Sequence, residues 1–101
     1  MPYIKTEQRK QLYPKIQEIV DEIVIVSDND KEKIWGVLNY VVTMICLFTI
    51  KRVFIKLKGY SLLQRFIGLI ECVKLEVYRR LVAPYEDGKA IENSDVFDID
   101  N

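Results

Sequence analysis

The sequence has no histidine, two cysteines, four glycines and three prolines among its 101 residues. Because histidine is the usual general base near neutral pH and the commonest zinc ligand, its absence disfavours acid–base catalysis and zinc binding. A serine or cysteine nucleophile would also lack the histidine that normally activates it. The glycines stand far apart, so the chain has no glycine-rich phosphate loop. We therefore expect a non-enzymatic protein that needs no metal and no cofactor.

The charges of the chain limit its partners. Its 15 basic and 15 acidic residues cancel, so no overall positive field attracts nucleic acid, and we expect no nucleic-acid partner. Cys46 and Cys72 lie in apolar stretches, which favours small buried thiols of a reducing cytosol over a disulfide. Residues 1–10 lack the apolar core of a signal peptide. These features predict a cytoplasmic protein.

The length of the chain suits one domain with a single core. Helix signals predict three main helices, near residues 14 to 25, 31 to 55 and 61 to 82. The predicted fold class is therefore all-α, a small bundle of about three helices with a short extended C-terminal arm. Residues 1 to 91 make the helical domain. Residues 92 to 101, which are rich in acidic side chains, make a solvated tail.

The third of these helices has the clearest signal. Ser61 followed by Gln64 fits a capping box, in which two side chains satisfy amides of the first turn. Apolar residues at helical spacing then form one stripe, namely Leu62, Phe66, Leu69, Ile70, Val73, Val77 and Leu81. Pro84 lacks the amide that would continue the helix, so the helix should end near Val82. The sequence Glu86-Asp87-Gly88 is then typical of a turn.

The first helix should begin at Pro14, because the fixed φ of proline suits the first helical position and the missing amide is not needed there. We expect Thr6 to cap a separate turn before it. The β-branched run 23–26 favours the end of this helix over a strand, since no partner strand follows at hairpin distance. The loop Ser27-Asp28-Asn29-Asp30 is rich in N-cap residues, so the second helix should begin near Lys31.

The second helix is unusually apolar. From Ile34 to Ile50 there are 17 residues without a charge, bracketed by Lys33 and Lys51-Arg52. This length is at the lower limit for a membrane span, and scattered polar residues dilute the apolar character. The alternative is a helix at the centre of a bundle or in a subunit interface. We favour the interface, because a small monomer has difficulty covering a helix that is apolar all round. The segment therefore predicts a homo-oligomer, and we expect no membrane span.

Short motifs stand along nearly the whole chain: Met1-Pro2-Tyr3-Ile4, Leu38-Asn39-Tyr40-Val41-Val42-Thr43, Ile67-Gly68, Glu71-Cys72-Val73-Lys74-Leu75-Glu76-Val77-Tyr78-Arg79-Arg80, Ala83-Pro84-Tyr85-Glu86-Asp87 and Glu92-Asn93-Ser94-Asp95-Val96. With these motifs the sequence resembles a family of uncharacterised small proteins of phages, bacteria and archaea. Two features depart from that family. The segment after Thr43 is more apolar, and Ser94 stands where a glycine is more usual. The resemblance implies a compact intracellular domain of phage or prokaryotic origin, and it implies no activity.

The candidate ligand site consists of polar side chains on the third helix and at its exit, joined by two from the second helix. They are Asn39, Tyr40, Arg65, Lys74, Tyr78, Arg79, Arg80 and Tyr85. The guanidinium group of arginine forms paired hydrogen bonds to phosphate oxygens. A tyrosine ring can stack on a base, and its hydroxyl can donate a hydrogen bond. The set indicates a small anionic, nucleotide-like ligand.

An alternative interpretation treats these cations as part of a surface and interface network. In it the arginines pair with Glu71, Glu76, Glu86 and Asp87. Glu76 and Arg80, four residues apart, have the spacing at which opposite charges meet on a helix. Residue type alone favours this network over a ligand site.

Acidic residues offer a weaker hypothesis. Three pairs resemble faintly those with which helical nucleotide pyrophosphohydrolases hold magnesium, namely Glu18 with Asp21, Glu71 with Glu76, and Glu92 with Asp95. Such a site needs four carboxylates that converge from facing helices. The first pair lies on a predicted solvent face and the last in the predicted tail, so this pattern is weak.

These patterns favour a small binding protein. Its most concrete form is a phage-type protein that captures a nucleotide-derived immune signalling molecule in a pocket of a homo-oligomer, an anti-defence sponge in the cytoplasm of the host cell. That idea combines residue chemistry with an analogy of size and composition to compact helical phage proteins. One alternative is a protein–protein interaction inhibitor or regulator. A second is a magnesium-dependent enzyme that resembles nucleotide pyrophosphohydrolases.

Overall fold

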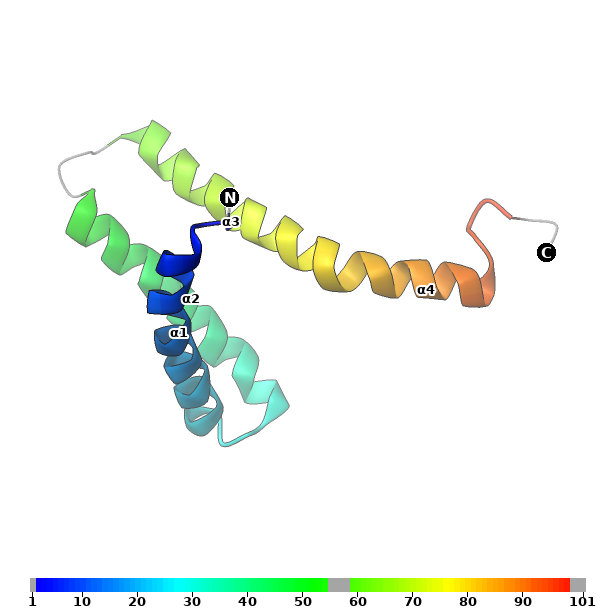
Figure 1. Ribbon diagram of the computed structural model, residues 1–101, viewed down its shortest axis with the longest axis horizontal. Helices are drawn as coiled ribbons and strands as arrows, with labels where there is room; N and C mark the ends of the chain where they lie inside the picture. Colours follow the sequence, from blue (N-terminus) through cyan, green and yellow to red (C-terminus); the bar gives the residue numbers. More distant parts are fainter. Residues whose placement is uncertain (1, 55–58, 99–101) are drawn as a thin grey trace. The chain divides into compact units, whose positions relative to one another are not determined.

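The computed structural model describes residues 2–54 and 59–98. This part of the chain forms four α-helices and one π-helical segment, and it contains no strand (Figure 1). The prediction of an all-α fold is thereby confirmed. The chain divides into two compact units, Met1–Lys58 and Gly59–Asn101. The single domain of residues 1 to 91 stays a prediction.

The first unit begins with helix α1, which runs from Thr6 to Val26. The prediction that this helix starts at Pro14 was wrong, because Pro14 lies inside α1. Proline in a helix interior removes one hydrogen bond and crowds the carbonyl four residues earlier, yet α1 continues on both sides of Pro14. Thr6 is the first helical residue rather than a cap, and the Lys5 N–H donates to Gln8 Oε1 at 3.1 Å.

A short loop joins α1 to α2, which runs from Lys31 to Val53. Asp28 and Asn29 adopt left-handed φ angles of 55° and 54°, a conformation that these two residue types tolerate better than most. Asp30 caps α2, because its Oδ1 accepts from the Glu32 N–H at 2.9 Å. The predicted start of this helix at Lys31 is confirmed. Its predicted extension to residue 55 lies outside the described residues.

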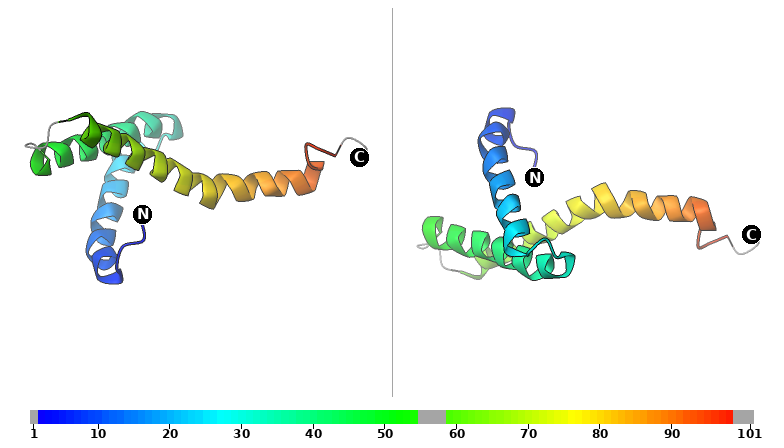
Figure 2. Two further views of the ribbon diagram at one scale, coloured as in Figure 1. Left: turned by 90° about the horizontal axis from the view of Figure 1, so that it is seen from above. Right: turned by 90° about the horizontal axis from the view of Figure 1, so that it is seen from below.

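Helices α1 and α2 meet near the loop and diverge away from it (Figure 2). Ile23 and Ser27 are the buried residues within the described ranges, and both lie at the end of α1 next to the loop. On α2, a row of half-buried apolar side chains with helical spacing includes Ile34, Val37 and Val41. The core of the first unit is therefore thin, and most of its apolar side chains are exposed.

The second unit is one continuous helical stretch (Figure 1). It consists of α3 from Tyr60 to Val77, the π-helical segment η1 from Tyr78 to Val82, and α4 from Ala83 to Asn93. The predicted helix end near Val82 and the predicted turn at residues 86–88 were both wrong, because α4 continues through them. The predicted capping box at Ser61 is also absent, since α3 begins at Tyr60 with Gly59 as its N-cap and without a side-chain cap.

Pro84 explains both the continuation and the π-helical segment. In a regular α-helix its ring would clash with the carbonyl of Arg80, four residues earlier. In η1 the Ala83 N–H instead bonds the carbonyl of Tyr78, five residues earlier. The wider turn makes room at the proline, and the chain stays helical through it.

Helix α4 ends at Asn93, and Ser94 follows with φ 71° and ψ 156°. Glycine is nearly alone in adopting this conformation readily, so the departure from the family noted at Ser94 coincides with a strained backbone. The described residues after it make a turn, in which the Asp98 N–H bonds the Asp95 carbonyl at 2.9 Å. The predicted tail of residues 92 to 101 thus overlaps the end of α4.

Candidate functional site

The eight predicted ligand residues are divided between the two units. Asn39 and Tyr40 lie on α2 of the first unit. The other six lie in the second unit, namely Arg65, Lys74, Tyr78, Arg79, Arg80 and Tyr85.

On α2, the Thr43 hydroxyl donates to Asn39 Oδ1 at 3.2 Å. Tyr40 lines an open groove between α1 and α2, and Glu18 and Glu22 of α1 line the same groove. These two carboxylates give the groove a negative charge, which repels an anion. The surroundings of Tyr40 in the first unit therefore do not favour a nucleotide-like ligand.

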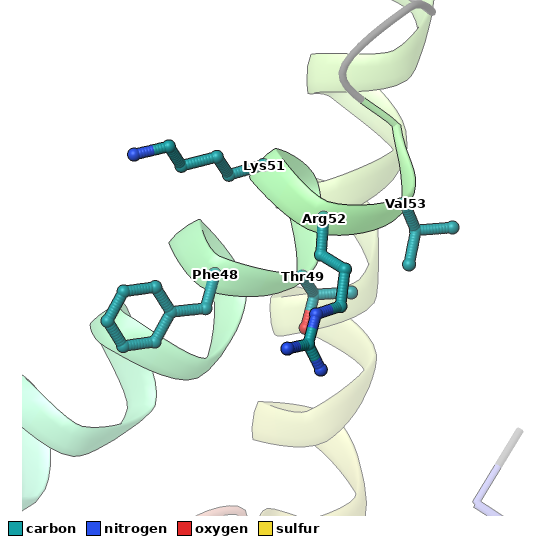
Figure 3. A pocket seen from close by; sticks show the side chains of 5 residues that line it. All are labelled: Phe48, Thr49, Lys51, Arg52 and Val53. Atoms are coloured by element: carbon teal, nitrogen blue, oxygen red, sulfur yellow. The ribbon is translucent and has the colours of Figure 1, made fainter.

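A second open hollow lies at the C-terminal end of α2, where Lys51 and Arg52 stand beside Phe48. An aromatic ring with two cations is a combination that suits an anionic ligand. Figure 3 shows, however, that the three side chains point in different directions and do not converge on one point. This end of α2 has the right residue types without the geometry of a binding site.

On α3, Arg65 lies apart from the other cations. Nine residues separate it from Lys74, which is about two and a half turns, or about 14 Å, along an α-helix. The two side chains consequently leave the helix on opposite sides. Lys74 is paired with Glu71, three residues earlier, and its Nζ lies 2.8 Å from Glu71 Oε1.

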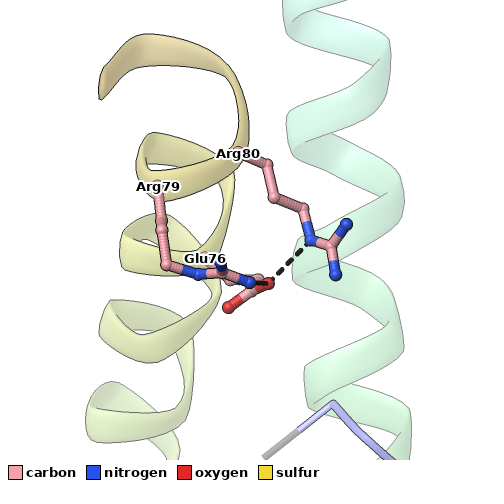
Figure 4. A network of polar contacts seen from close by, with 3 residues as sticks. All are labelled: Glu76, Arg79 and Arg80. Atoms are coloured by element: carbon pink, nitrogen blue, oxygen red, sulfur yellow. Dashed lines mark hydrogen bonds and ion pairs between the residues drawn. The ribbon is translucent and has the colours of Figure 1, made fainter. Parts of the chain in front are cut away.

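Glu76 holds the two arginines of η1 together (Figure 4). Its Oε1 accepts from Arg79 Nη2 and from Arg80 Nε, each at 2.7 Å. The Glu76 side chain is only 23% exposed, whereas the arginine side chains are 62% and 59% exposed. The expected pairing of Glu76 with Arg80 is confirmed. The carboxylate of Glu76 is therefore partly covered, whereas both arginine side chains are more than half exposed.

Tyr78 is held by Glu86 of α4, because its hydroxyl donates to Glu86 Oε2 at 2.9 Å. This hydrogen bond and the negative charge of Glu86 raise the pKa of Tyr78 above its usual value, with smaller contributions from desolvation and from Asp87. Eight residues of α-helix rotate a side chain by about 800°, which leaves it about 80° out of line. The extra residue in the π-helical turn reduces this offset to about 20°, so the π-helix lets Tyr78 and Glu86 meet.

Tyr85 lies one turn before Lys89, whose Nζ stands 5.7 Å from the centre of the Tyr85 ring. Lys89 also pairs with Glu92 at 3.2 Å. Sequence reasoning missed Lys89, because its spacing from Tyr85 becomes meaningful only when the helix continues beyond Pro84. It also missed the bond between Tyr78 and Glu86, which depends on the π-helical turn.

The weaker hypothesis of a magnesium site needs several converging carboxylates. Within the residues that the structure describes, no three aspartate, glutamate or cysteine side chains gather closely enough to hold a metal ion. Glu71 and Glu76 each contact a cationic side chain instead. The described residues of one chain thus show no such cluster, and the hydrolase remains an alternative prediction.

The fold and the site define a small all-α protein with a cluster of arginine and tyrosine side chains on a π-helical turn. The family described as "Domain of unknown function (DUF6899)" matches residues 1–96. The chain therefore belongs to the DUF6899 family. Neither a curated protein nor a solved structure matches the chain.

Proposed function

We propose that this protein captures a small anionic, nucleotide-like ligand with the side chains of η1 and its two neighbouring turns. The proposal is carried by one observation. The π-helical segment among the described residues, Tyr78–Val82, contains three of the residues that the sequence singles out as ligand-binding, Tyr78, Arg79 and Arg80. Most π-helical turns are short insertions into α-helices, and they occur frequently at functional sites.

The chemistry of the segment suits phosphate groups. Arg79 and Arg80 are consecutive residues, and both contact one carboxylate oxygen of Glu76. The two guanidinium groups therefore already share one anionic partner. A phosphate carries more charge and more acceptor oxygens than a carboxylate, and it can bond both arginines at once. Tyr78 and Tyr85 lie close by in sequence and supply rings for a base or hydroxyls for a sugar.

The ligand is bound and not converted. On this proposal the protein is a sponge of phage type, which lowers the free concentration of a nucleotide-derived immune signal in the host cytoplasm. A homo-oligomer would bring several copies of the η1 segment together and build a pocket between them. The size and the helical composition of the chain support the analogy with compact phage proteins that act in this way.

The proposal is tested with a panel of cyclic dinucleotides and trinucleotides, ADP-ribose derivatives and nucleoside triphosphates, with and without Mg²⁺. Native mass spectrometry of the purified protein should show one retained and unmodified nucleotide. Loss of one charge-assisted contact weakens binding by about 10-fold to 100-fold, so Arg79→Ala or Arg80→Ala should weaken retention by that factor. Arg9→Ala, which removes an exposed arginine from α1, is the matched control and should bind as the wild type does.

Two results would contradict capture. Conversion of the bound nucleotide would identify an enzyme and would favour the hydrolase alternative. Equal retention by the wild type, Arg79→Ala and Arg80→Ala would move the binding site away from η1.

A regulator that acts through protein–protein contacts is the second candidate, and the exposed apolar side chains favour it. Ile67, Val73 and Leu81 of the second unit are 68%, 56% and 69% exposed. A regulator would tolerate charge reversal at Arg79 and Arg80 and would lose its partner when such apolar residues are changed. If no nucleotide of the panel is retained, regulation through protein–protein contacts becomes the better account of the function.

A further inference from the structure

A row of side chains on α2 is left uncovered by α1. Trp35, Leu38, Val42 and Ile45 follow each other at alternating spacings of three and four residues, and they are 68%, 40%, 46% and 51% exposed. We call these four side chains the α2 seam. Alternation of three and four is the spacing with which one helix packs along another. The seam therefore has the pattern of a helix-packing surface.

Helix α1 carries a matching row. Tyr13, Val20 and Val24 are 64%, 50% and 38% exposed. At about 100° per residue, this row lies about 80° around α1 from Ile23, which is buried near the loop. The α2 seam lies about 100° around α2 from the row that includes Val37 and Val41.

Because the two helices run in opposite directions, these rotations carry both rows to the same side of the unit. The groove on the opposite side is lined largely by apolar residues, but it also carries the carboxylates of Glu18 and Glu22. The first unit thus has one broad uncharged apolar face, made of the α2 seam and the α1 row, and an opposite side on which two carboxylates border an apolar groove.

We infer that the apolar face of the first unit pairs with the same face of a second copy of this chain. The seven side chains of this face carry no charge, so two copies meet without repulsion between like charges. Two helices from each copy make a four-helix arrangement, in which facing apolar rows supply the common core. Such a core would supplement the thin core of the first unit, in which Ile23 is the one buried apolar residue in the described ranges.

A lipid bilayer is the rival occupant, because Lys31–Val53 is long and apolar enough to cross a membrane by length and composition. Its uncharged part of 17 residues spans about 25 Å, which is less than the hydrocarbon thickness of about 30 Å. Asn39 and Thr43, which are hydrogen-bonded to each other, would also lie in the middle of the bilayer. Hydrocarbon offers no partner for the two amide hydrogens of Asn39, because Asn39 accepts in its bond with Thr43. These features favour a protein partner.

The test uses sedimentation velocity over a concentration series, in buffer without detergent. The wild-type chain should be a dimer or a larger even-numbered assembly. Val42→Glu places a charge in the seam and should raise the dissociation constant at least 10-fold. Leu47→Glu is the matched control, because Leu47 is 53% exposed on the same helix and lies away from the seam. This control should assemble as the wild type does.

Trp35 gives a readout that needs no substitution, since it is the one tryptophan of the chain and it belongs to the seam. Dilution of the wild type should shift its fluorescence to longer wavelength as the copies separate. A wild-type monomer with concentration-independent emission would overturn the inference. Flotation of the protein with phosphatidylglycerol vesicles, lost equally in Val42→Glu and Leu47→Glu, would overturn it in favour of the membrane. None of these measurements involves a nucleotide, so they succeed or fail independently of the proposed ligand capture.

Discussion

Glu76 has the central position among the side chains of the candidate site, because two arginines share one of its oxygens. Exposed ion pairs on helices contribute at most about 1 kcal/mol each, so this cluster adds little to the stability of the fold. The cluster matters for its geometry. Glu76 holds two guanidinium groups side by side that would otherwise repel each other, so that one anionic ligand can contact both.

Tyr78 makes the folded chain sensitive to high pH. Its hydrogen bond to Glu86 raises its pKa in the folded state, so this contact stabilises the fold below about pH 10, the usual tyrosine pKa, and is lost as the pH rises through the folded pKa. The thermal unfolding midpoint of the wild type should exceed that of Tyr78→Phe at pH 8. The difference should shrink or reverse toward pH 12. Circular dichroism measures both midpoints.

Tyr60, which is 75% exposed at the start of α3, provides the control for that experiment. Tyr60→Phe should follow the wild type across the whole pH range. A constant difference between the wild type and Tyr78→Phe from pH 8 to pH 12 would show that the hydrogen bond to Glu86 does not stabilise the fold.

Ser94 is strained, and the strain can be relieved by substitution. Glycine adopts the φ and ψ of Ser94 without a steric penalty, so Ser94→Gly should raise the free energy of unfolding by about 1 kcal/mol. Urea denaturation followed by circular dichroism measures the change. Asp95→Gly is a useful comparison because it adds the same flexibility one residue later and should not stabilise the chain. A lower stability of Ser94→Gly would argue against strain at this position.

Pro84 sets the shape of the second unit at the scale of the helix. Pro84→Ala removes the clash that the π-helical turn relieves, so η1 should become regular α-helix. Alanine in a helix interior is favoured over proline by up to about 3 kcal/mol, and the helix should therefore become more stable. The contact between Tyr78 and Glu86 should be lost at the same time. Stability by circular dichroism and nucleotide retention by native mass spectrometry should then change in opposite directions.

Retention of the nucleotide by Pro84→Ala at wild-type strength would contradict a role of the π-helical turn in binding. Glu86→Gln is the companion variant. It weakens the charged hydrogen bond to Tyr78 and leaves Pro84 and the turn in place, so it separates the contribution of the contact from that of the backbone.

The helices could be predicted where local rules agree and could not where proline is involved. The loop at residues 27–30 and the start of α2 followed from N-cap residues, which act through neighbouring amides alone. Pro14 and Pro84 were both taken as helix boundaries, and the chain remains helical through both. A π-helical turn depends on a shift of hydrogen bonds over five residues, and residue propensities contain no signal for it.

The contacts of the candidate site could likewise be predicted only where regular helix geometry fixes them. The pairing of Glu76 with Arg80 was predictable, because its spacing of four residues is fixed by the helix. The bond from Tyr78 to Glu86 was not, because it needs both a helix beyond Pro84 and the altered rotation of η1. The place of Asn39 and Tyr40 in a ligand pocket remains a prediction, since a shared pocket depends on assembly.

At the scale of the whole molecule, each of the two units of this DUF6899 family member has apolar surface that the unit itself does not cover. The second unit has no buried residue in α3, η1 or α4. Isolated helices are only marginally stable in water, so these helices need packing partners. On this account, the first unit would mediate assembly of the copies. The second unit would capture the ligand.

The central claim is that Arg79 and Arg80 hold the ligand. Its most direct test is a titration of the retained nucleotide into ¹⁵N-labelled protein, with the arginine Nε–H signals assigned from single Arg→Lys variants. The signals of Arg79 and Arg80 should move together and saturate at the measured dissociation constant. The signals of Arg9 and Arg52 should stay in place. Saturable binding that leaves the signals of Arg79 and Arg80 unchanged would contradict the claim.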